Sequence, residues 1–413
     1  MRIKIVTFLI LGALCSLYSY PAYAVDTPLP GSVGDAINTD ASFSFPSSTT
    51  NTEEPIVSTD DFFQGKVLRI ISENSDLGYG LGTGTDVFTQ VLDVQILGGS
   101  EKGKIVSTTN QIPLSDKDIK RLTIGTSVII GKNLIGNEVQ YYISDVYRLN
   151  SLWIVLAIFI SITLLLTKFQ GLKAFAGLFA SFVVITWYIL PQILHGGNPT
   201  LVSTIGTTII AATSLYIAHG FHRRTSIAFV GTLISIAIAV TLSYIFVRVT
   251  HLFGMGSEEA FYLQFAPGTS INLRGLLLGG IIIGVLGILD DITTAQAAVV
   301  EQIYHANPTL SSRQLYKRGS LVGREHILSL VNTLVLAYTG ASLPLILLFK
   351  IYQRPIWVTL NSEIIMEEIV RMLIGSITLI IAVPITTLIA AEYYNRRKPP
   401  IPEDLGESHG HVH

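Results

Sequence analysis

Two adjacent carboxylates, Asp290 and Asp291, end a long apolar run in the C-terminal half of the chain. Glu301 follows eleven residues after Asp290, and eleven helical steps return to within about 20° of the starting direction. One face of the predicted helix therefore carries Asp290, Thr294, Ala297 and Glu301. Acidic side chains at bilayer depth are costly and usually face a bundle interior or a wet cavity. Such carboxylates could bind a cation or carry a proton; the alternative is that the pair marks where the helix leaves the bilayer.

A series of glycines precedes the two carboxylates. Glycines on a membrane helix allow another backbone to approach closely. The series comprises Gly275, Gly279, Gly280, Gly284 and Gly287. The stretch is predicted to be a close-packed membrane helix that delivers its carboxylates to a polar site.

A second polar pair, Asn332 and Thr333, lies inside another apolar run. A side-chain amide in lipid needs several hydrogen-bond partners, so the pair is a candidate contact for a substrate or ion. The alternative is interhelical hydrogen bonding, worth about 1 kcal/mol per contact. Pro344 and Pro384 are expected to kink or break the last two spans, as in transporters with broken helices.

Signatures of soluble enzymes are missing from the sequence. It has no Gly-rich phosphate loop, no His-Glu-x-x-His and no nucleophile elbow. The carboxylates do not exclude an intramembrane enzyme, but nothing in the sequence supplies the other groups that such chemistry needs. We therefore favour a non-enzymatic function and predict no cofactor and no metal.

The composition indicates an integral membrane protein. The 413 residues are 49% hydrophobic and 14% charged, against about 25% charged residues in soluble domains, and the mean hydropathy is +0.53. The lipid bilayer is thus the first predicted partner. The net charge of −2 and the lack of a basic stretch give no indication of nucleic-acid binding.

Four segments precede or follow the predicted membrane region, which covers residues 150–392. Residues 1–24 have the charged start, short apolar core and Ala-Tyr-Ala end of a signal peptide. The alternative is an uncleaved anchor. Cys15, the only cysteine, lies within it, so the mature chain is predicted to have no disulfide.

Residues 25–60 are a flexible linker rich in Ser, Thr and Pro. Residues 61–149 contain short β-rich runs and are predicted to form a small β-barrel or sandwich. Residues 393–413 are the tail.

Seven spans of roughly 20 apolar residues are predicted. They are Leu152–Thr167, Ala174–Leu194, Leu201–Ala218, Ile227–Val247, Leu273–Leu289, Ile327–Phe349 and Met372–Ala391. The fold class is thus a polytopic α-helical membrane protein with a small N-terminal, extracytoplasmic all-β domain. The path of residues 292–326 stays open between a continued helix, an interfacial helix and a re-entrant segment.

The distribution of basic residues orients these spans, because cytoplasmic loops are rich in Lys and Arg. With the β domain outside, the predicted inner loops and tail hold Lys168, Lys173, Arg223, Arg224, Arg313, Lys317, Arg318, Arg324, Arg396, Arg397 and Lys398. The exported signal indicates the same orientation independently. We predict a bacterial cell-membrane protein with its C-terminus in the cytoplasm.

Several blocks of this sequence resemble the YibE/F family of multi-pass bacterial membrane proteins. The specific blocks are GGIIIGVLGILDDITTAQAAVVEQI and GREHILSLVNTLVLAYTGASLPL, and the weaker ones are VLDVQILGGSEKGK, YRLN and GMGSEEAFYL. By this resemblance the family's acidic position corresponds to Asp291, with Asp290 as its variable neighbour, and the family's Asn-Thr pair corresponds to Asn332 and Thr333. The resemblance implies a multi-pass protein with an extracytoplasmic β-rich segment and implies no settled activity.

Three functions follow from these features. The first is a permease or secondary transporter that couples a small solute or cation to protons through Asp291 and Glu301, although no inverted repeat is evident. The second is an envelope-associated scaffold or assembly factor whose β domain recruits an extracytoplasmic protein partner. The third is an intramembrane enzyme. The sequence leaves the substrate, the coupling ion and the oligomeric state open.

Overall fold

The computed structural model describes six stretches of the chain. They are residues 61–77, 86–114, 117–135, 138–265, 271–352 and 355–396. The predicted signal peptide, the linker and all but the first residues of the predicted tail lie outside the described residues. The chain divides into two compact units that meet at Leu165 and Leu166, and each unit is described by itself.

The β domain of the first unit is a single antiparallel sheet of five strands in the order β3-β2-β1-β4-β5. The strands are β1 (Asp61–Leu77), β2 (Asp86–Ile96), β3 (Ile105–Pro113), β4 (Ser127–Ile135) and β5 (Glu138–Val146), with a short helix α2 (Lys117–Lys120) before β4. Strand β3 alternates exposed and buried side chains, as a half-buried strand does. The predicted β-rich N-terminal domain is therefore confirmed.

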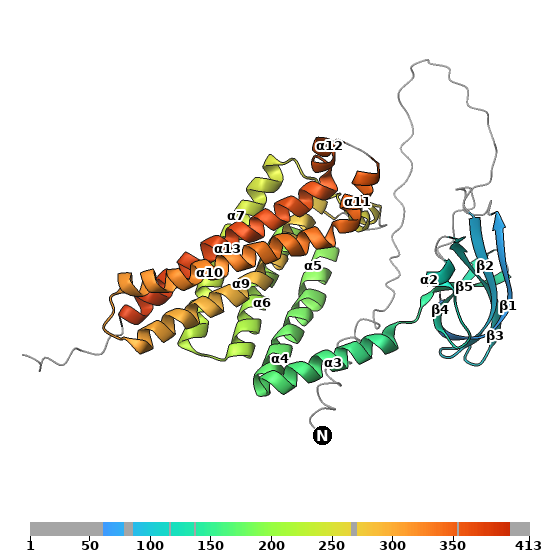
Figure 1. Ribbon diagram of the computed structural model, residues 1–413, viewed down its shortest axis with the longest axis horizontal. Coiled ribbons are helices and arrows are strands. Elements are labelled where there is room, and N and C mark those ends of the chain that lie inside the picture. The colour runs from blue at the N-terminus through green and yellow to red at the C-terminus, as the bar shows by residue number, and fades with distance from the viewer. Residues whose placement is uncertain are drawn as a thin grey trace, which may run out of the picture. The chain divides into compact units, whose positions relative to one another are not determined.

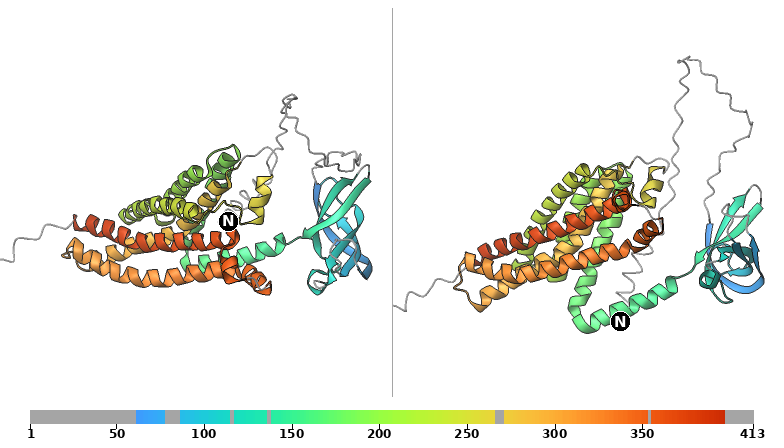
Figure 2. Two further views of the ribbon diagram at one scale, coloured as in Figure 1. Left: turned by 90° about the horizontal axis from the view of Figure 1, so that it is seen from above. Right: turned by 45° about the horizontal axis from the view of Figure 1, so that its top comes forward.

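Side chains join the two edge strands of this sheet. Thr108 on β3 donates a hydrogen bond of 2.9 Å to the backbone carbonyl of Tyr141 on β5. Lys104 donates to the Tyr141 hydroxyl at 2.7 Å, and that hydroxyl donates to Glu101 at 2.5 Å. The sheet therefore curls upon itself around an apolar core, as the wrapped strands in Figure 2 show. The core includes Val67, Leu92, Val94, Val128 and Ile130.

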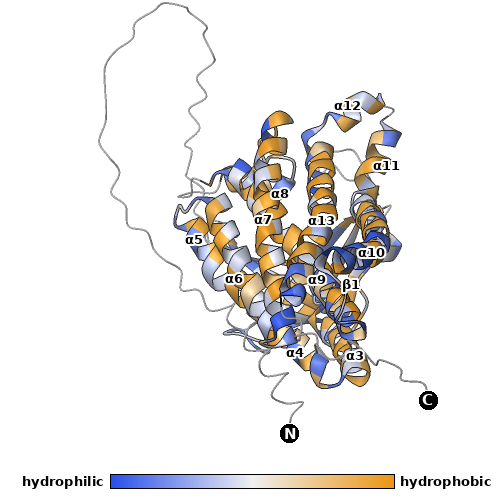
Figure 3. Cartoon of the chain, turned by 90° about the vertical axis from the view of Figure 1, so that its left-hand side faces the viewer, coloured by the Kyte–Doolittle hydropathy of each residue, from blue (hydrophilic) through white to orange (hydrophobic). Residues whose placement is uncertain are grey.

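The chain is helical from Leu149 onward (Figure 1). Its helices are α3 (Leu149–Thr167), α4 (Phe169–Val184), a π-helical turn η2 (Ile185–Ile189), α5 (Leu190–Leu194), α6 (Pro199–His219), α7 (Arg223–Val249), α8 (Glu258–Gln264), α9 (Leu273–Ala306), α10 (Ser312–Ala341), α11 (Leu343–Ile351), α12 (Ile356–Leu360) and α13 (Glu363–Asn395). Apolar residues dominate the long helices (Figure 3).

Six helical segments of the described chain are long and apolar enough to cross a membrane, and a bent pair raises the number to seven. The bent pair is α10 and α11, which meet at 55°. The predicted polytopic α-helical fold is thus confirmed. Pro344 stands at the start of α11, where its missing N–H is tolerated. Pro384, by contrast, lies inside α13, which continues past it.

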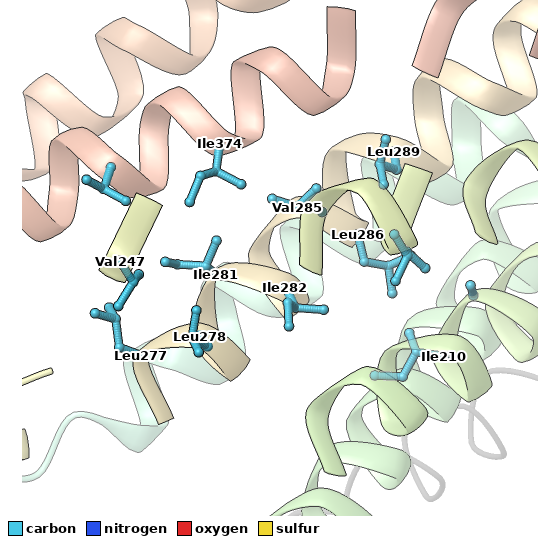
Figure 4. Packing of buried hydrophobic residues seen from close by; sticks show 14 of the residues in the cluster. Ile210, Val247, Leu277, Leu278, Ile281, Ile282, Val285, Leu286, Leu289 and Ile374 are labelled. Atoms are coloured by element: carbon cyan, nitrogen blue, oxygen red, sulfur yellow. The ribbon is translucent and has the colours of Figure 1, made fainter. Parts of the chain in front are cut away.

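Helix α9 is the central element of the second unit, because it packs against α6, α7, α10 and α13. Its apolar side chains Ile281, Ile282 and Leu289 are fully buried. Figure 4 shows Ile281 and Ile282 between Ile210 of α6 and Ile374 of α13. The helix does not end at Leu289 but continues to Ala306. The open question about residues 292–306 is therefore answered by a continued helix.

The glycines of α9 lie on two different faces. A Cβ atom at Gly279 would collide with the Ser203 hydroxyl of α6, and one at Gly275 would lie 3.3 Å from Pro199. By contrast, Cβ atoms at three positions would have no atom within 4 Å, namely Gly280, Gly284 and Gly287. The packing prediction thus applies to two of the five glycines, and the other three line a face of α9 that no described residue covers.

Candidate functional site

Asp290 lies on the face of α9 that packs toward α6. The Ser214 side chain of α6 forms a hydrogen bond with the Asp290 carboxylate. The other carboxylate oxygen, Oδ1, is buried and has no hydrogen-bond partner in the described part of the chain. Gly177 lets α4 pack closely on this part of α6, since a Cβ there would lie 3.3 Å from the Ser214 carbonyl oxygen. Helix α6 therefore covers one incompletely satisfied carboxylate of α9, and α4 packs on α6 beside Ser214.

Asp291 occupies a different environment from its neighbour. Its side chain is exposed and lies on the open face that also carries Gly280, Gly284 and Gly287. Successive helical residues differ by about 100° in direction, so adjacent carboxylates cannot both face the same neighbour. Asp291 interacts electrostatically with Asp290 and with His219 at the end of α6. Of the two predicted carboxylates, the structure therefore encloses Asp290 and leaves Asp291 at the surface of the unit.

Glu301 belongs to a cluster contributed by three helices. The Tyr394 hydroxyl of α13 donates to Glu301 Oε1 at 2.9 Å. Arg224 of α7 approaches the other oxygen, with 3.4 Å between Nη1 and Oε2. The Tyr394 ring stacks on Tyr304 at a centroid distance of 5.2 Å, which holds its hydroxyl in place. Glu301 thus has partners from segments 77 and 93 residues away in the sequence.

Ionisable side chains of α6, α7 and α9 lie between the two carboxylate sites and influence one another electrostatically. His219 interacts electrostatically with both Asp291 and Arg224, and Arg224 contacts Glu301. Together they form a row that runs from the enclosed carboxylate of Asp290 along α9 to the end of the bundle where α6 ends and α7 begins. In such a row the carboxylates and the histidine can exchange protons, whereas the arginine stays charged and can only orient a neighbouring carboxylate.

Gln296 is a buried polar residue that the sequence analysis did not single out. It is fully buried, and its Nε2 donates to the Gly319 carbonyl at 2.9 Å and to Thr387 Oγ1 at 2.7 Å. Its Oε1 is buried without a hydrogen-bond partner among the residues described. The available signal was an amide two turns after Asp290 in an otherwise small-residue and apolar segment.

Asn332 and Thr333 are not brought to the carboxylates. Both side chains are exposed, and Thr333 donates to the Ser329 carbonyl of its own helix at 2.9 Å. The reason lies in the packing of α10, whose buried residues all belong to its first half: Leu315, Gly319 and Gly323. The pair therefore stays a prediction that the arrangement of the described residues does not connect with Asp290.

Two features mark the opposite end of the bundle. Glu363 of α13 accepts hydrogen bonds from three successive backbone N–H groups, those of Phe253, Gly254 and Met255. Glu367 accepts one from Gly256 at 3.0 Å. These carboxylates fasten the loop before α8 to α13. A mainly apolar cavity of about 790 Å³ also lies at this end, and its lining includes Tyr338, Ile346, Ile356, Thr359, Glu368 and Met372.

Comparison with known proteins now assigns the helical region. Residues 155–396 match the family described as YibE/F-like protein, which covers more than half of the chain. The chain belongs to the YibE/F family. No curated protein matches it, and no solved structure matches it. Membership in the YibE/F family and the apolar helices together make this a multi-pass membrane protein.

The chemistry available to this YibE/F protein is that of hard oxygen donors and protons. Among the residues that the structure describes, no group of three or more His, Cys, Asp or Glu side chains could hold a metal ion together. The enclosed site instead offers one carboxylate and neighbouring hydroxyls, which suit a proton or a weakly bound alkali cation.

Proposed function

We propose that this protein is a permease or secondary transporter that couples the movement of a small solute or cation to a proton or alkali cation at Asp290. The observation that carries the proposal is the buried Oδ1 atom of Asp290, which has no hydrogen-bond partner in the described structure. A structural carboxylate in a helix bundle is normally satisfied on both oxygens. An unsatisfied carboxylate oxygen is a place where a proton, a cation or an ordered water molecule can bind.

The free-energy cost of burying the Asp290 carboxylate favours a bound proton or cation. Burying a carboxylate without a partner is costly, and either a proton or a cation removes most of that cost. The Ser214 hydroxyl already contacts the carboxylate. The Thr294 hydroxyl, one helical turn further, is also buried without a partner in the described chain. The site therefore combines one charge with two neutral oxygens.

The row from Asp291 to Glu301 supplies the route to one side of the membrane. His219, Arg224 and Glu301 lie in sequence toward the end of the bundle. The positive-inside rule supports a cytoplasmic location for that end, because Arg223 and Arg224 stand there. Under this proposal, Asp290 exchanges its proton or cation with the cytoplasm past Asp291 and His219, while Arg224 keeps its charge and holds Glu301 in place.

Proteoliposomes that contain a pH-sensitive dye test the proposal. Solutes and cations are added outside, and proton movement is followed in the wild type, in Asp290→Asn and in Asp291→Asn. We expect Asp290→Asn to abolish solute-dependent proton movement and Asp291→Asn to slow it. The exposed Glu325 of α10 provides the matched control, since Glu325→Gln should leave the rate unchanged. Equal rates in wild type and Asp290→Asn would refute the proposal.

A second candidate function is an envelope-associated scaffold, and one feature of the β domain favours it. Phe62, Gly131 and Tyr142 are aligned across β1, β4 and β5. Phe62 is 57% exposed and Tyr142 is 36% exposed, so aromatic surface is available for a protein partner. Crosslinking in cells should then capture one partner that Phe62→Ser together with Tyr142→Ser loses, while proton movement continues. Retained capture in the double variant would exclude this surface.

A further inference from the structure

The turn between α6 and α7, together with Glu301 of α9, borders an open cavity of about 510 Å³. It is lined by Phe221, His222, Arg223, Arg224 and Glu301. Two guanidinium groups and one carboxylate therefore face the same space. The two arginines outnumber the single carboxylate, so the lining carries an excess positive charge, which favours an anionic ligand.

Arg224 has hydrogen-bonding capacity that the described residues do not use. Its Nη1 is 3.4 Å from Glu301 Oε2, which is a long contact for an ion pair. Its Nε is buried and has no acceptor in the described part of the chain. A guanidinium presents five N–H donors in a planar fork, and an oxyanion with several oxygens satisfies that fork best.

Glu301 does not neutralise the cavity. Its Oε1 accepts a hydrogen bond of 2.9 Å from Tyr394, which holds the carboxylate toward α13. Its Oε2 offsets only part of the charge of Arg224, and Arg223 is exposed beside it. An anion in the cavity would therefore meet two guanidinium groups and one carboxylate whose charge is partly compensated.

The exposed ring of Phe221 indicates that this cavity lies at the depth of a membrane interface. Its side chain is 86% exposed, and its ring stacks on Tyr216 at a centroid distance of 4.7 Å. Exposed aromatic rings next to basic residues at the end of a span are typical of the headgroup region. We propose that this cavity binds a phosphate group, carried either by an anionic lipid headgroup or by a soluble phosphate. The site shares Arg224 and Glu301 with the proposed route to Asp290, but phosphate binding at this site does not require that the protein transports a solute.

Two arms of one experiment distinguish the sources of the phosphate. In the first, native mass spectrometry counts phosphatidylglycerol molecules retained by the full-length protein from detergent micelles, with phosphatidylcholine as the neutral lipid. In the second, the thermal unfolding of the full-length protein is measured in inorganic phosphate and in chloride at equal ionic strength. Each arm uses the wild type, Arg224→Gln, Arg224→Lys, Arg223→Gln and Glu301→Gln. The control is Arg313→Gln, which removes an exposed arginine of α10.

Arg224→Gln and Arg224→Lys should weaken binding roughly tenfold or more, because each loses the guanidinium fork. Arg223→Gln, at an exposed position, should fold normally and bind more weakly, whereas Glu301→Gln should bind more tightly because a negative charge is removed. Retained phosphatidylglycerol without an effect of phosphate assigns a lipid headgroup, and stabilisation by phosphate assigns the phosphate group itself. Binding that is equal in the wild type and in both Arg223→Gln and Arg224→Lys, or no binding in either arm, would overturn the proposal.

Discussion

Replacing Gln296 by methionine tests whether the side-chain amide of this residue contributes to the stability of the fold. Gln296 is fully buried at the junction of α9, α10 and α13. Methionine has a similar length and fills the same space with flexible, apolar atoms. The substitution therefore removes the amide without leaving a large cavity.

The structure allows the change in stability to be estimated. Gln296→Met loses two hydrogen bonds, each worth about 0.6 kcal/mol on average between membrane helices. It also removes the buried Oε1 atom that has no partner in the described chain, and an unsatisfied acceptor costs about 1–3 kcal/mol. Thr387 keeps its own hydrogen bond to the Val383 carbonyl at 2.6 Å. The two effects nearly cancel, so the variant should unfold with a free energy equal to or slightly above that of the wild type.

Reversible unfolding by SDS in mixed micelles measures this difference. The exposed Gln302 on the same helix provides the matched control, Gln302→Met. Gln296→Ala should destabilise by about 2–4 kcal/mol, because it leaves a cavity. If Gln296→Met lost as much stability as Gln296→Ala, the amide would be structural and its Oε1 would have a partner. Near-neutral stability would show that the amide is kept for a reason other than stability.

Three further perturbations test other parts of the structure. Gly323→Ala should destabilise the protein by about 1–3 kcal/mol, because the new Cβ would lie 2.5 Å from Val383 Cγ1 and 2.8 Å from Gln296 Oε1. The control in the same SDS titration is Gly284→Ala, whose new Cβ would have no atom within 4 Å. Equal stabilities of the two variants would contradict the close packing of α10 on α13 at Gly323. Glu363→Gln removes the negative charge of the side chain that accepts hydrogen bonds from three backbone N–H groups, so hydrogen exchange of residues 253–255 should accelerate. The control, Glu259→Gln on α8, should leave this exchange unchanged. Unaltered exchange in Glu363→Gln would show that Glu363 does not hold the loop before α8. In the β domain, hydrogen bonds from Lys132, Tyr141 and Lys104 lower the pKa of Glu101 to about 2. Because the pKa is lowered on folding, this stabilisation is complete above the unfolded pKa of about 4.5 and is lost as the pH falls toward 2. Hydrogen exchange of β3, corrected for its intrinsic pH dependence, should therefore rise over that interval in the wild type and change less in Glu101→Gln; identical pH profiles would contradict the role of Glu101.

The sequence was sufficient to predict the apolar spans and the β-rich domain, but not how α9 is rotated about its own axis. Apolar runs and turn signals predict the helices and the β-rich domain because hydrophobic length and periodicity are local properties. The direction of Asp290 is not local, since it depends on the close contacts of Gly275 and Gly279 with α6. A rotation of one residue, about 100°, would exchange Asp290 and Asp291.

The partners of the predicted site residues were beyond the sequence for the same reason. The position of Glu301 among alanines and valines indicated an unusual environment, but Arg224 and Tyr394 come from distant segments. The polarity of Asn332 within an apolar run suggested a buried amide, yet α10 buries residues only in its first half. Polarity within a span therefore identifies candidates, and helix packing decides which of them meet.

The most direct test of the account is the thermal unfolding of the full-length protein across pH and a panel of alkali cations, in the wild type, Asp290→Asn and Asp291→Asn. A ligand at 100 times its dissociation constant stabilises by about 2.7 kcal/mol. We expect stabilisation by a cation or by acid to disappear in Asp290→Asn and to persist in Asp291→Asn. The same dependence of thermal stability on pH and cations in all three proteins would contradict a binding site at the Asp290 carboxylate. A loss of stabilisation confined to Asp291→Asn would also contradict it.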